Sequence, residues 1–402
     1  MKRWKKRMDI KIFLFWLLVV GGGFTFGGIN EAIAKDYFVA VANGKDGNAG
    51  TKEAPFLTLE KGVSVLLPGD TLNVRGGTYQ RSKYLWSPPN GDSWENAITI
   101  KNYKGEKVTV KPLPGYSVFE FEPGSQFIVM DGFIIDAKGG HGGIRTGEGS
   151  HHIRIMNGEV MNAPSQGILA GKNSEYFEFI NLRIHDNGTT DLDHGIYLAS
   201  NHHLVKDCSI YRNAGWGVHI YSSGNRPSFN VVMNNKIFDN ARLGHRGAGI
   251  GLYSGEGNMA INNLIWGSLQ IGIQIHYDAL TSKVYNNTVY GNKSGILVGT
   301  RAKNSKVVNN ISYNNSSNNF ENAGENTSSN NNLTENPLFI DASKRDFHLQ
   351  SGSPAILAGS IISEVAYDFE YKPRSSNANY DIGAFQAGES LAPPTALKIL
   401  NR

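Results

Sequence analysis

The sequence predicts an all-β solenoid, in which short parallel strands coil around one axis to form a parallel β-helix. A short strand-like segment that begins with glycine recurs from about residue 141 at spacings of roughly 22 to 32 residues. A second element, marked by paired asparagines, recurs between these segments. No part of the repeat has helical periodicity of useful length. Each unit is therefore most simply a coil of strands, stacked about 4.8 Å from the next coil.

The recurring strand reads glycine, apolar, variable, usually apolar, variable, so two side chains point inward and two point outward. It occurs as GIRTG at 143, GILAG at 167, GIYLAS at 195, GVHIYS at 217, GIGLYS at 249, GIQIHY at 272 and GILVGT at 295. Because equivalent strands stack, we expect their outward side chains to form columns along the solenoid axis.

The asparagine element is typical of a tight turn. It occurs as INLRIHDN at 180, KDCSIYRN at 206, NNKIFDN at 234, NNLIWGS at 262, NNTVYGN at 286 and NNISYNN at 309. Asparagine tolerates the left-handed backbone region, and its amide can bond to the equivalent asparagine above and below. The segment NNSSNNFENAGENTSSNNN at 314–332 also has the composition of a disordered polar tract.

The N-terminal end has the features of a secretory signal peptide. Basic residues between Lys2 and Lys11 precede the apolar run IFLFWLLVVGGGFTFGGI, and AIA follows at 32–34. A membrane anchor is the alternative, but the glycine-rich second half of the run favours cleavage before Lys35. We therefore expect a secreted or periplasmic protein with no membrane span after residue 34.

The charge balance argues against a nucleic-acid partner. Of the 39 basic and 35 acidic side chains, six and two lie in residues 1–34, which leaves 33 of each in the mature chain. A near-neutral chain has no global field to attract nucleic acid or anionic membrane, so a charged substrate needs a local site. Cys208 is the only cysteine, so we expect a buried free thiol and a fold without internal disulfides.

The chain divides into four segments in this interpretation. Residues 1–34 are the signal peptide, 35–110 the N-terminal cap and first coils, and 111–317 the central coils with the site. Residues 318–402 hold the Asn-rich segment, the last coils and a C-terminal cap. Because a solenoid must cover its apolar interior at both ends, we expect residues 54–74 to supply a capping amphipathic helix that stops at Pro68-Gly69.

Three stretches resemble secreted bacterial proteins of the pectate-lyase-like superfamily. They are the N-terminal YFVAVANGKDGNAGTKEAPFLTLEKGVSVLLPGDTLNVRGGTY, the Asn-marked coils, and the closing NPLFIDASKRDFHLQSGSPAILAG with DIGAFQ at 381–386. The resemblance covers almost all of the mature chain and implies a right-handed parallel β-helix. The same scaffold hosts polysaccharide lyases, mannuronan epimerases, glycoside hydrolases and non-catalytic relatives, so it implies the fold more closely than the reaction.

Two predicted columns of outward side chains mark a candidate site. The third position of each strand gives Arg145, Leu169, Tyr197, His219, Gly251, Gln274 and Leu297. Two residues on, the column reads Gly147, Gly171, Ala199, Tyr221, Tyr253, His276 and Gly299. The polar and aromatic members cluster in the coils that start at 195, 217, 249 and 272. We expect this bounded patch to bind substrate through Tyr253, Gln274 and His276.

A strand entry and an insertion border the same patch. DLDH brings Asp191, Asp193 and His194 ahead of the coil with Tyr197, and the loop NARLGHRGAG at 240–249 adds Arg242, His245 and Arg246. Insertions that interrupt a repeat commonly build its binding face. The two aspartates are typical of a turn, and as an alternative they offer oxygen ligands to Ca²⁺, the one cofactor that the sequence suggests.

The patch suits β-elimination on an acidic, uronic-acid-containing polysaccharide. This reaction needs a base, neutralisation of the substrate carboxylate and an acid for the leaving oxygen. We predict His219 or His194 as the base, Tyr221 or Tyr197 as the proton donor and Arg246 as the carboxylate clamp, with Arg242 and His245 binding substrate. We also expect the protein to act as a monomer.

Three alternatives remain open at this point. A uronate epimerase shares the first step, but DLDH lacks the proline and spacing of the epimerase D-P-H element. A glycoside hydrolase needs two carboxylates across one cleft, which the columns do not supply. A non-catalytic carbohydrate-binding or surface-structural solenoid would use the outward tyrosines for stacking or cross-strand packing.

Overall fold

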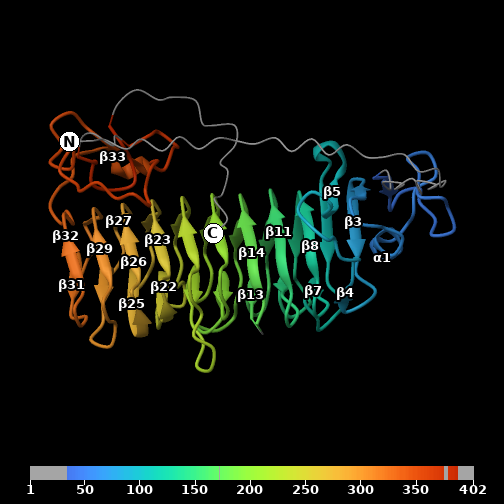
Figure 1. The fold of residues 1–402 in the computed structure, drawn as a ribbon, viewed down its shortest axis with the longest axis horizontal. Helices are drawn as coiled ribbons and strands as arrows, with labels where there is room; N and C mark the ends of the chain where they lie inside the picture. Colours follow the sequence, from blue (N-terminus) through green and yellow to red (C-terminus); the bar gives the residue numbers. More distant parts are fainter. Residues whose placement is uncertain (1–33, 172, 375–378, 388–402) are drawn as a thin grey trace, which may run out of the picture. The chain divides into compact units, whose positions relative to one another are not determined.

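The computed structural model describes residues 34–387 except 172 and 375–378, so the predicted signal peptide lies almost wholly outside the described residues. The described chain is a right-handed parallel β-helix, as expected, with three long parallel sheets along one axis (Figure 1). Within these residues, no helix has the length and hydrophobicity that a membrane crossing requires.

The first sheet has twelve strands. In order they are β1 (Asp36–Val39), β2 (Thr71–Val74), β5 (Ile98–Asn102), β8 (Gln126–Asp131), β11 (His151–Met156), β14 (Glu175–Ile180), β17 (Leu204–Lys206), β20 (Val231–Met233), β23 (Met259–Ile261), β26 (Lys283–Tyr285), β29 (Lys306–Val308) and β32 (Ser328–Asn330).

The second sheet has ten strands. They are β3 (Gly77–Gln80), β6 (Val108–Lys111), β9 (Phe133–Asp136), β12 (Glu159–Met161), β15 (Arg183–His185), β18 (Ser209–Tyr211), β21 (Lys236–Phe238), β24 (Leu264–Trp266), β27 (Thr288–Tyr290) and β30 (Ile311–Tyr313).

The third sheet, which carries the predicted patch, also has ten strands. They are β4 (Leu85–Trp86), β7 (Phe119–Phe121), β10 (Ile144–Arg145), β13 (Ile168–Ala170), β16 (Ile196–Leu198), β19 (Val218–Ile220), β22 (Ala248–Glu256), β25 (Ile271–Leu280), β28 (Ser294–Val298) and β31 (Phe320–Asn322).

One continuous apolar core fills the space between the three sheets. In β16 the side chains of Ile196 and Leu198 are fully buried, whereas Tyr197 between them is partly exposed. The same alternation recurs from coil to coil, because each strand places alternate side chains on opposite faces. The period-two pattern of the repeat therefore sets which side chains face outward.

The two asparagines of each pair have different structural roles. The first of each pair, Asn234, Asn262, Asn286 or Asn309, has a φ of 51° to 60°, in the left-handed region. The second belongs to a buried stack in which each Nδ2 donates to the Oδ1 of the next coil, at 2.9 Å from Asn235 to Asn263 and again from Asn263 to Asn287. Each turn is thus closed by its own backbone and tied to the next turn.

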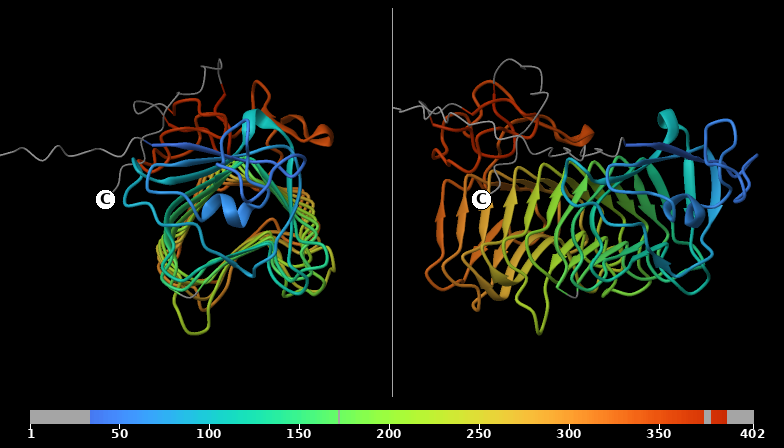
Figure 2. Two further views of the ribbon diagram at one scale, coloured as in Figure 1. Left: turned by 90° about the vertical axis from the view of Figure 1, so that its right-hand side faces the viewer. Right: turned by 45° about the vertical axis from the view of Figure 1, so that its right-hand side comes forward.

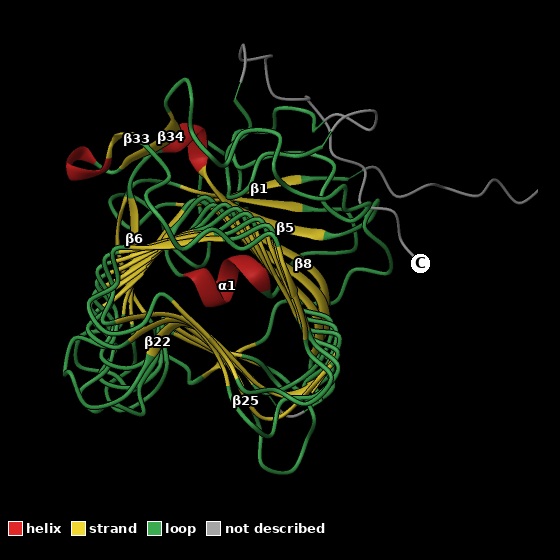
Figure 3. Ribbon diagram, turned by 90° about the vertical axis from the view of Figure 1, so that its left-hand side faces the viewer, coloured by secondary structure: helices red, strands yellow, loops and turns green. Residues whose placement is uncertain are grey.

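The N-terminal helix is shorter than expected. Only α1 (Leu59–Val63) is helical within 54–74; Thr58 Oγ1 caps it by accepting the Lys61 backbone N–H at 3.2 Å. After the turn at Pro68-Gly69 the chain enters β2, which pairs with β1. Figure 3 shows α1 in the opening between the sheets at this end, where Leu59 and Val63 are buried.

The described residues 334–374 and 379–387 lie on the outside of the coil, against the first and second sheets (Figure 2). This C-terminal segment contains the short antiparallel pair β33 (Phe339–Asp341) and β34 (Asp346–Leu349). Two single-turn 3₁₀ helices, η1 (Tyr103–Gly105) and η2 (Ala342–Lys344), complete the elements. Phe347 packs on Trp266 with ring centroids 5.8 Å apart, and Tyr371 Oη donates to both carboxylate oxygens of Asp207. The segment therefore shields apolar side chains on an outer face.

Candidate active site

An open groove of about 540 Å³ crosses the third sheet at β19, β22 and β25. Seven side chains predicted from the sequence line it: His219, Tyr221, His245, Arg246, Tyr253, Gln274 and His276. The sequence did not single out six others: Leu192, Trp216, Gly247, Gln270, Ile271 and Tyr277. None of the described residues that line the groove is aspartate or glutamate.

Strand register brings the predicted columns together. Tyr197 pairs with His219, His219 with Gly251, and Gly251 with Gln274. The register shifts between Leu252 and Ser254, where β22 meets β25. Beyond this irregularity Tyr277 is exposed on the groove side, with its ring centroid 5.2 Å from that of Tyr253.

Two histidines form a hydrogen-bonded pair on the groove floor. His219 Nδ1 lies 3.0 Å from His194 Nε2, and His194 Nδ1 accepts the backbone N–H of Trp216 at 3.4 Å. Because His194 Nδ1 is the acceptor, His194 Nε2 carries the proton and donates it to His219 Nδ1. Neutral His219 then carries its own proton on Nε2.

Burial keeps both histidines neutral. His194 and His219 are 3% and 6% exposed. Removal from water lowers the pKa of His194 to about 3 and lowers the pKa of His219 well below 6.5, with the neighbouring His194 adding to the shift of His219. His219 stacks on Trp216 with centroids 4.4 Å apart, and Tyr253 meets it edge-on at 4.7 Å. His219 Nε2 is thus buried where these rings pack and has no hydrogen-bond partner among the described residues.

Three buried ring nitrogens along the groove have no hydrogen-bond partner among the described residues. They belong to Trp216 (Nε1), His219 (Nε2) and His276 (Nδ1). His276 remains partly exposed; burial, followed by the charge of Arg301, lowers its pKa below 6.5. His276 is therefore a neutral imidazole that faces the groove near neutral pH.

Tyr253 is held over the floor by Gln274. Its Oη donates a hydrogen bond to Gln274 Oε1, and burial raises its pKa. Tyr221 lies beside it, with ring centroids 6.3 Å apart, and keeps part of its side chain exposed. Of these two tyrosines, Tyr221 is the one open to a substrate. Tyr197 lies one coil away and stacks on His219 at 5.4 Å, and burial raises its pKa too.

Arg246 and His245 form the rim of the groove. Arg246 is largely exposed and lies 3.8 Å from the Asp191 carboxylate. Arg242, predicted beside them, instead donates to the backbone carbonyls of Gly188 and Arg212. Arg242 therefore supports the loop and does not line the groove.

The DLDH aspartates do not fit a Ca²⁺ site. Asp193 Oδ2 accepts the backbone N–H groups of Thr189 and Thr190 at 3.0 and 2.7 Å and the Thr190 hydroxyl at 2.9 Å. Asp191 faces the guanidinium of Arg246. Nor do the described residues contain any group of three or more His, Cys, Asp or Glu side chains placed to hold a metal ion. Asp193 thus closes the turn that delivers His194.

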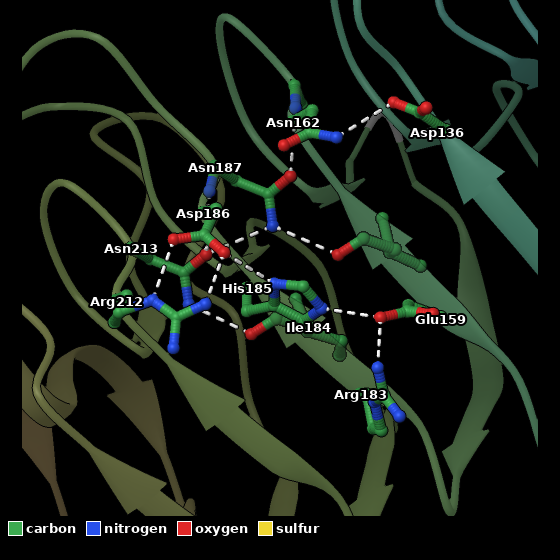
Figure 4. Close-up of polar contacts among 12 residues, drawn as sticks. Asp136, Glu159, Asn162, Arg183, Ile184, His185, Asp186, Asn187, Arg212 and Asn213 are labelled. Carbon is green, nitrogen blue, oxygen red and sulfur yellow. Dashed lines mark hydrogen bonds and ion pairs between the residues drawn. The ribbon is translucent and has the colours of Figure 1, made fainter.

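A second polar cluster lies on the second sheet, away from the groove (Figure 4). His185 bonds to Glu159 through Nε2 at 2.6 Å and to Asp186 through Nδ1 at 2.7 Å. Arg183 and Arg212 pair with the same two carboxylates. Because each of these charged groups is satisfied by its neighbours, the cluster ties adjacent coils together.

Comparison with known proteins agrees with this architecture. A family model described as a right-handed beta helix region matches residues 166–338. The chain therefore has the right-handed parallel β-helix fold that its three sheets show. It is similar to the crystal structure of pectate lyase Pel9A, with a TM-score of 0.72 and 18% identity over 88% of this chain and 96% of that chain. It is also similar to alginate lyase from Paenibacillus sp. str. FPU-7, with a TM-score of 0.53 and 13% identity over 75% and 98% of the two chains.

Two curated proteins match at the sequence level. Pectate lyase PEL9 of Emericella nidulans is 24% identical over 277 residues, which is 66% of this chain and 56% of that protein. The uncharacterized protein YwoF of Bacillus subtilis is 35% identical over 81 residues, 20% of this chain and 17% of that protein. The matches thus span just over half of one relative and about a sixth of the other.

Proposed function

We propose that the protein is a polysaccharide lyase that cleaves a uronic-acid-containing polymer in the groove of the third sheet. One observation carries the proposal: the groove gathers neutral imidazole and phenol groups over adjacent coils, with cationic side chains at its rim and no carboxylate in its lining. A negatively charged polymer is not repelled there, and the acid-base groups lie within reach of it.

In the proposed reaction a base removes the proton from the carbon next to the uronate carboxylate. The electron pair forms a carbon–carbon double bond, the glycosidic carbon–oxygen bond breaks, and the leaving oxygen takes a proton. Among the histidines, His276 is neutral and partly exposed as it stands, so we assign it the base. Tyr221 supplies the proton to the leaving oxygen, and Arg246 neutralises the carboxylate.

The sequence predicted either His219 or His194 as the base. In this proposal neither residue is the base. In the hydrogen-bonded pair the outer nitrogen of His219 carries a proton, and a base needs a free electron pair. His219 therefore acts as a hydrogen-bond donor to the substrate once the aromatic side chains packed around its Nε2 move aside. His194 is the residue that positions it.

The relatives named pectate lyase and alginate lyase support a polysaccharide substrate and a lyase reaction. The basic and apolar N-terminal sequence supports export, so we propose that the mature protein acts in the periplasm or outside the cell.

The test is incubation of the mature protein with alginate, pectate and glycosaminoglycans. Ultraviolet absorbance from unsaturated chain ends, produced by the wild type and lost in Tyr221→Phe, is the expected result. New reducing ends without that absorbance would assign a hydrolase. Binding without any new ends would assign a carbohydrate-binding module, and either outcome would overturn the lyase proposal.

A further inference from the structure

Two tyrosines on the N-terminal coils form an exposed aromatic pair. Tyr84 and Tyr116 are 49% and 45% exposed, and their ring centroids lie 5.5 Å apart with a 35° tilt. Isolated exposed aromatics are ordinary on a protein surface, but two in contact expose an apolar patch to water without packing into the core.

The backbone places this pair on the same edge of the third sheet as the groove. The Tyr116 carbonyl accepts the His141 N–H at 2.9 Å, and the His141 carbonyl accepts the Ser165 N–H at 3.0 Å. Gly167, two residues after Ser165, donates its N–H to the His194 carbonyl at 2.9 Å, which links this turn to the next coil. The turns at 116, 141, 165, 193 and 215 are therefore successive rungs of one edge.

The distance along this edge fits a polymer and exceeds a single sugar. Four rungs separate the turn of Tyr116 from the turn that carries Trp216, which at about 4.8 Å per rung is roughly 19 Å. A ligand that touches both the groove and the tyrosine pair must therefore be an extended chain of several sugars.

The side chains along the path favour a negatively charged chain. Arg145 lies on the outward column between the pair and the groove, one coil from Leu169 and two from Tyr197. Two exposed lysines form no ion pair among the described residues. Lys83 is next to Tyr84 in the chain, and Lys138 lies in the turn of the coil after that of Tyr116. Glu120, 3.9 Å from Arg145, offsets part of this charge, as do Asp191 and Asp193 at the rung nearest the groove; Asp191 faces Arg246, and Asp193 is bonded within its own turn.

We infer that the Tyr84–Tyr116 pair is a distal binding subsite, which holds an acidic polysaccharide whose chain continues along the third sheet to the groove. The inference rests on the proposed function for the class of substrate, but binding at the pair needs no turnover. A sugar ring would lie against the exposed tyrosine faces, and the two lysines and Arg145 would attract carboxylates of the same chain.

The test is polymer binding by affinity electrophoresis in gels that contain pectate or alginate, with a Tyr84→Ala/Tyr116→Ala double variant. We expect its dissociation constant for polymer to rise at least about fivefold, and its affinity for a uronate disaccharide to stay at the wild-type value. Phenylalanine at both positions should retain polymer binding, because the aromatic faces remain. Tyr367→Ala removes an exposed tyrosine of the C-terminal segment, 38% exposed, and is the matched control.

Each outcome separates this inference from the proposed function. Weaker polymer binding in the alanine variant, with no cleavage by the wild type, keeps the subsite and rejects the lyase. Cleavage by the wild type, with equal polymer binding by the variant and the control, rejects the subsite and keeps the lyase. A folded wild type that binds neither polymer rejects the subsite. Thermal unfolding midpoints of all variants check that each one is folded.

Discussion

At the scale of single residues, the site depends on which imidazole nitrogen carries a proton. Trp216, two residues before the first residue of β19, donates its backbone N–H to His194, and this contact sets the proton on the outer nitrogen of His219. In the proposed function, His219 donates a hydrogen bond and His276 removes the proton, so the two roles belong to different histidines of the same groove.

Substitution of His219 and of His276 separates these roles. His276→Ala should lower kcat by at least about 100-fold, because it removes the base. His219→Gln should keep activity within about tenfold of the wild type, because the glutamine amide can still donate near the position of Nε2. Steady-state kinetics on the cleaved polymer measures both. If His219→Gln were as inactive as His219→Ala while His276→Ala stayed active, His219 would be the base.

The pH dependence of kcat follows from the lowered pKa of His276. The imidazole must be neutral to accept a proton, and burial lowers its pKa below 6.5, so it is neutral above that value. We therefore expect activity to be full near pH 7 and to fall only as the pH drops below 6.5. A pH–rate profile whose acidic limb lies well above 6.5 would contradict the assignment.

Several groove residues were predictable from the repeat, and others were not. His219, Gln274 and their column neighbours follow from a strand period of two and coils in register. His194 was predicted from the DLDH stretch and not from the repeat. Trp216 was not predicted, because it precedes the first glycine of its strand, where no periodic pattern applies. Tyr277 projects because the register shifts between β22 and β25, and no sequence signal marks that shift.

At the scale of structural elements, the asparagine stack binds one coil to the next. Asn263 Oδ1 accepts the Asn235 backbone N–H at 3.1 Å and its Nδ2 at 2.9 Å, and Asn263 Nδ2 donates to the Val232 carbonyl at 2.8 Å. The side chain is fully buried, so no water can replace these bonds. The stack thereby positions the strands that follow each turn.

Asn263→Ala should lower the free energy of unfolding by about 3 kcal/mol or more, because it leaves several buried donors and acceptors unpaired. Urea denaturation measures the loss. The control is Asn318→Ala, which removes an exposed asparagine and should change stability by less than about 0.5 kcal/mol. Equal losses in the two variants would show that the stack adds no stability.

The ends of the coil were the least predictable elements. The helix expected within 54–74, with its end at Pro68-Gly69, is only Leu59–Val63, and the residues between Val63 and Pro68 form a turn and a loop. The strand after Pro68-Gly69 is β2, which pairs with β1. The described residues after 334 pack on apolar side chains of both the first and the second sheet. Only contacts between residues far apart in the chain determine that position.

At the scale of the whole molecule, buried neutral histidines link stability to pH. Burial lowers the pKa values of His194 and His203 to about 3 and lowers that of His219 well below 6.5. The unfolded chain binds protons on these groups below 6.5, and the folded chain does not. Their contribution to stability is therefore complete above pH 6.5 and is lost as the pH falls from 6.5 towards 3.

Urea unfolding at pH 7 and pH 5 tests this linkage. The loss should approach about 1.4 kcal/mol per pH unit for each of the three histidines. His203 Nδ1 accepts the Phe177 N–H at 3.2 Å, and His203→Asn keeps an acceptor near that position. This variant should reduce the change in unfolding free energy per pH unit by about a third. A change per pH unit equal to that of the wild type would mean that His203 is not the neutral group inferred here.

The most direct test of the central claim, that the groove of the third sheet is a uronate-binding active site, is a crystal structure of the Tyr221→Phe variant with a bound oligouronate. The account predicts a sugar chain across β19, β22 and β25, with one carboxylate near Arg246 and the carbon beside it facing His276. An oligouronate bound to another face of the coil, with the groove filled only by solvent, would contradict it.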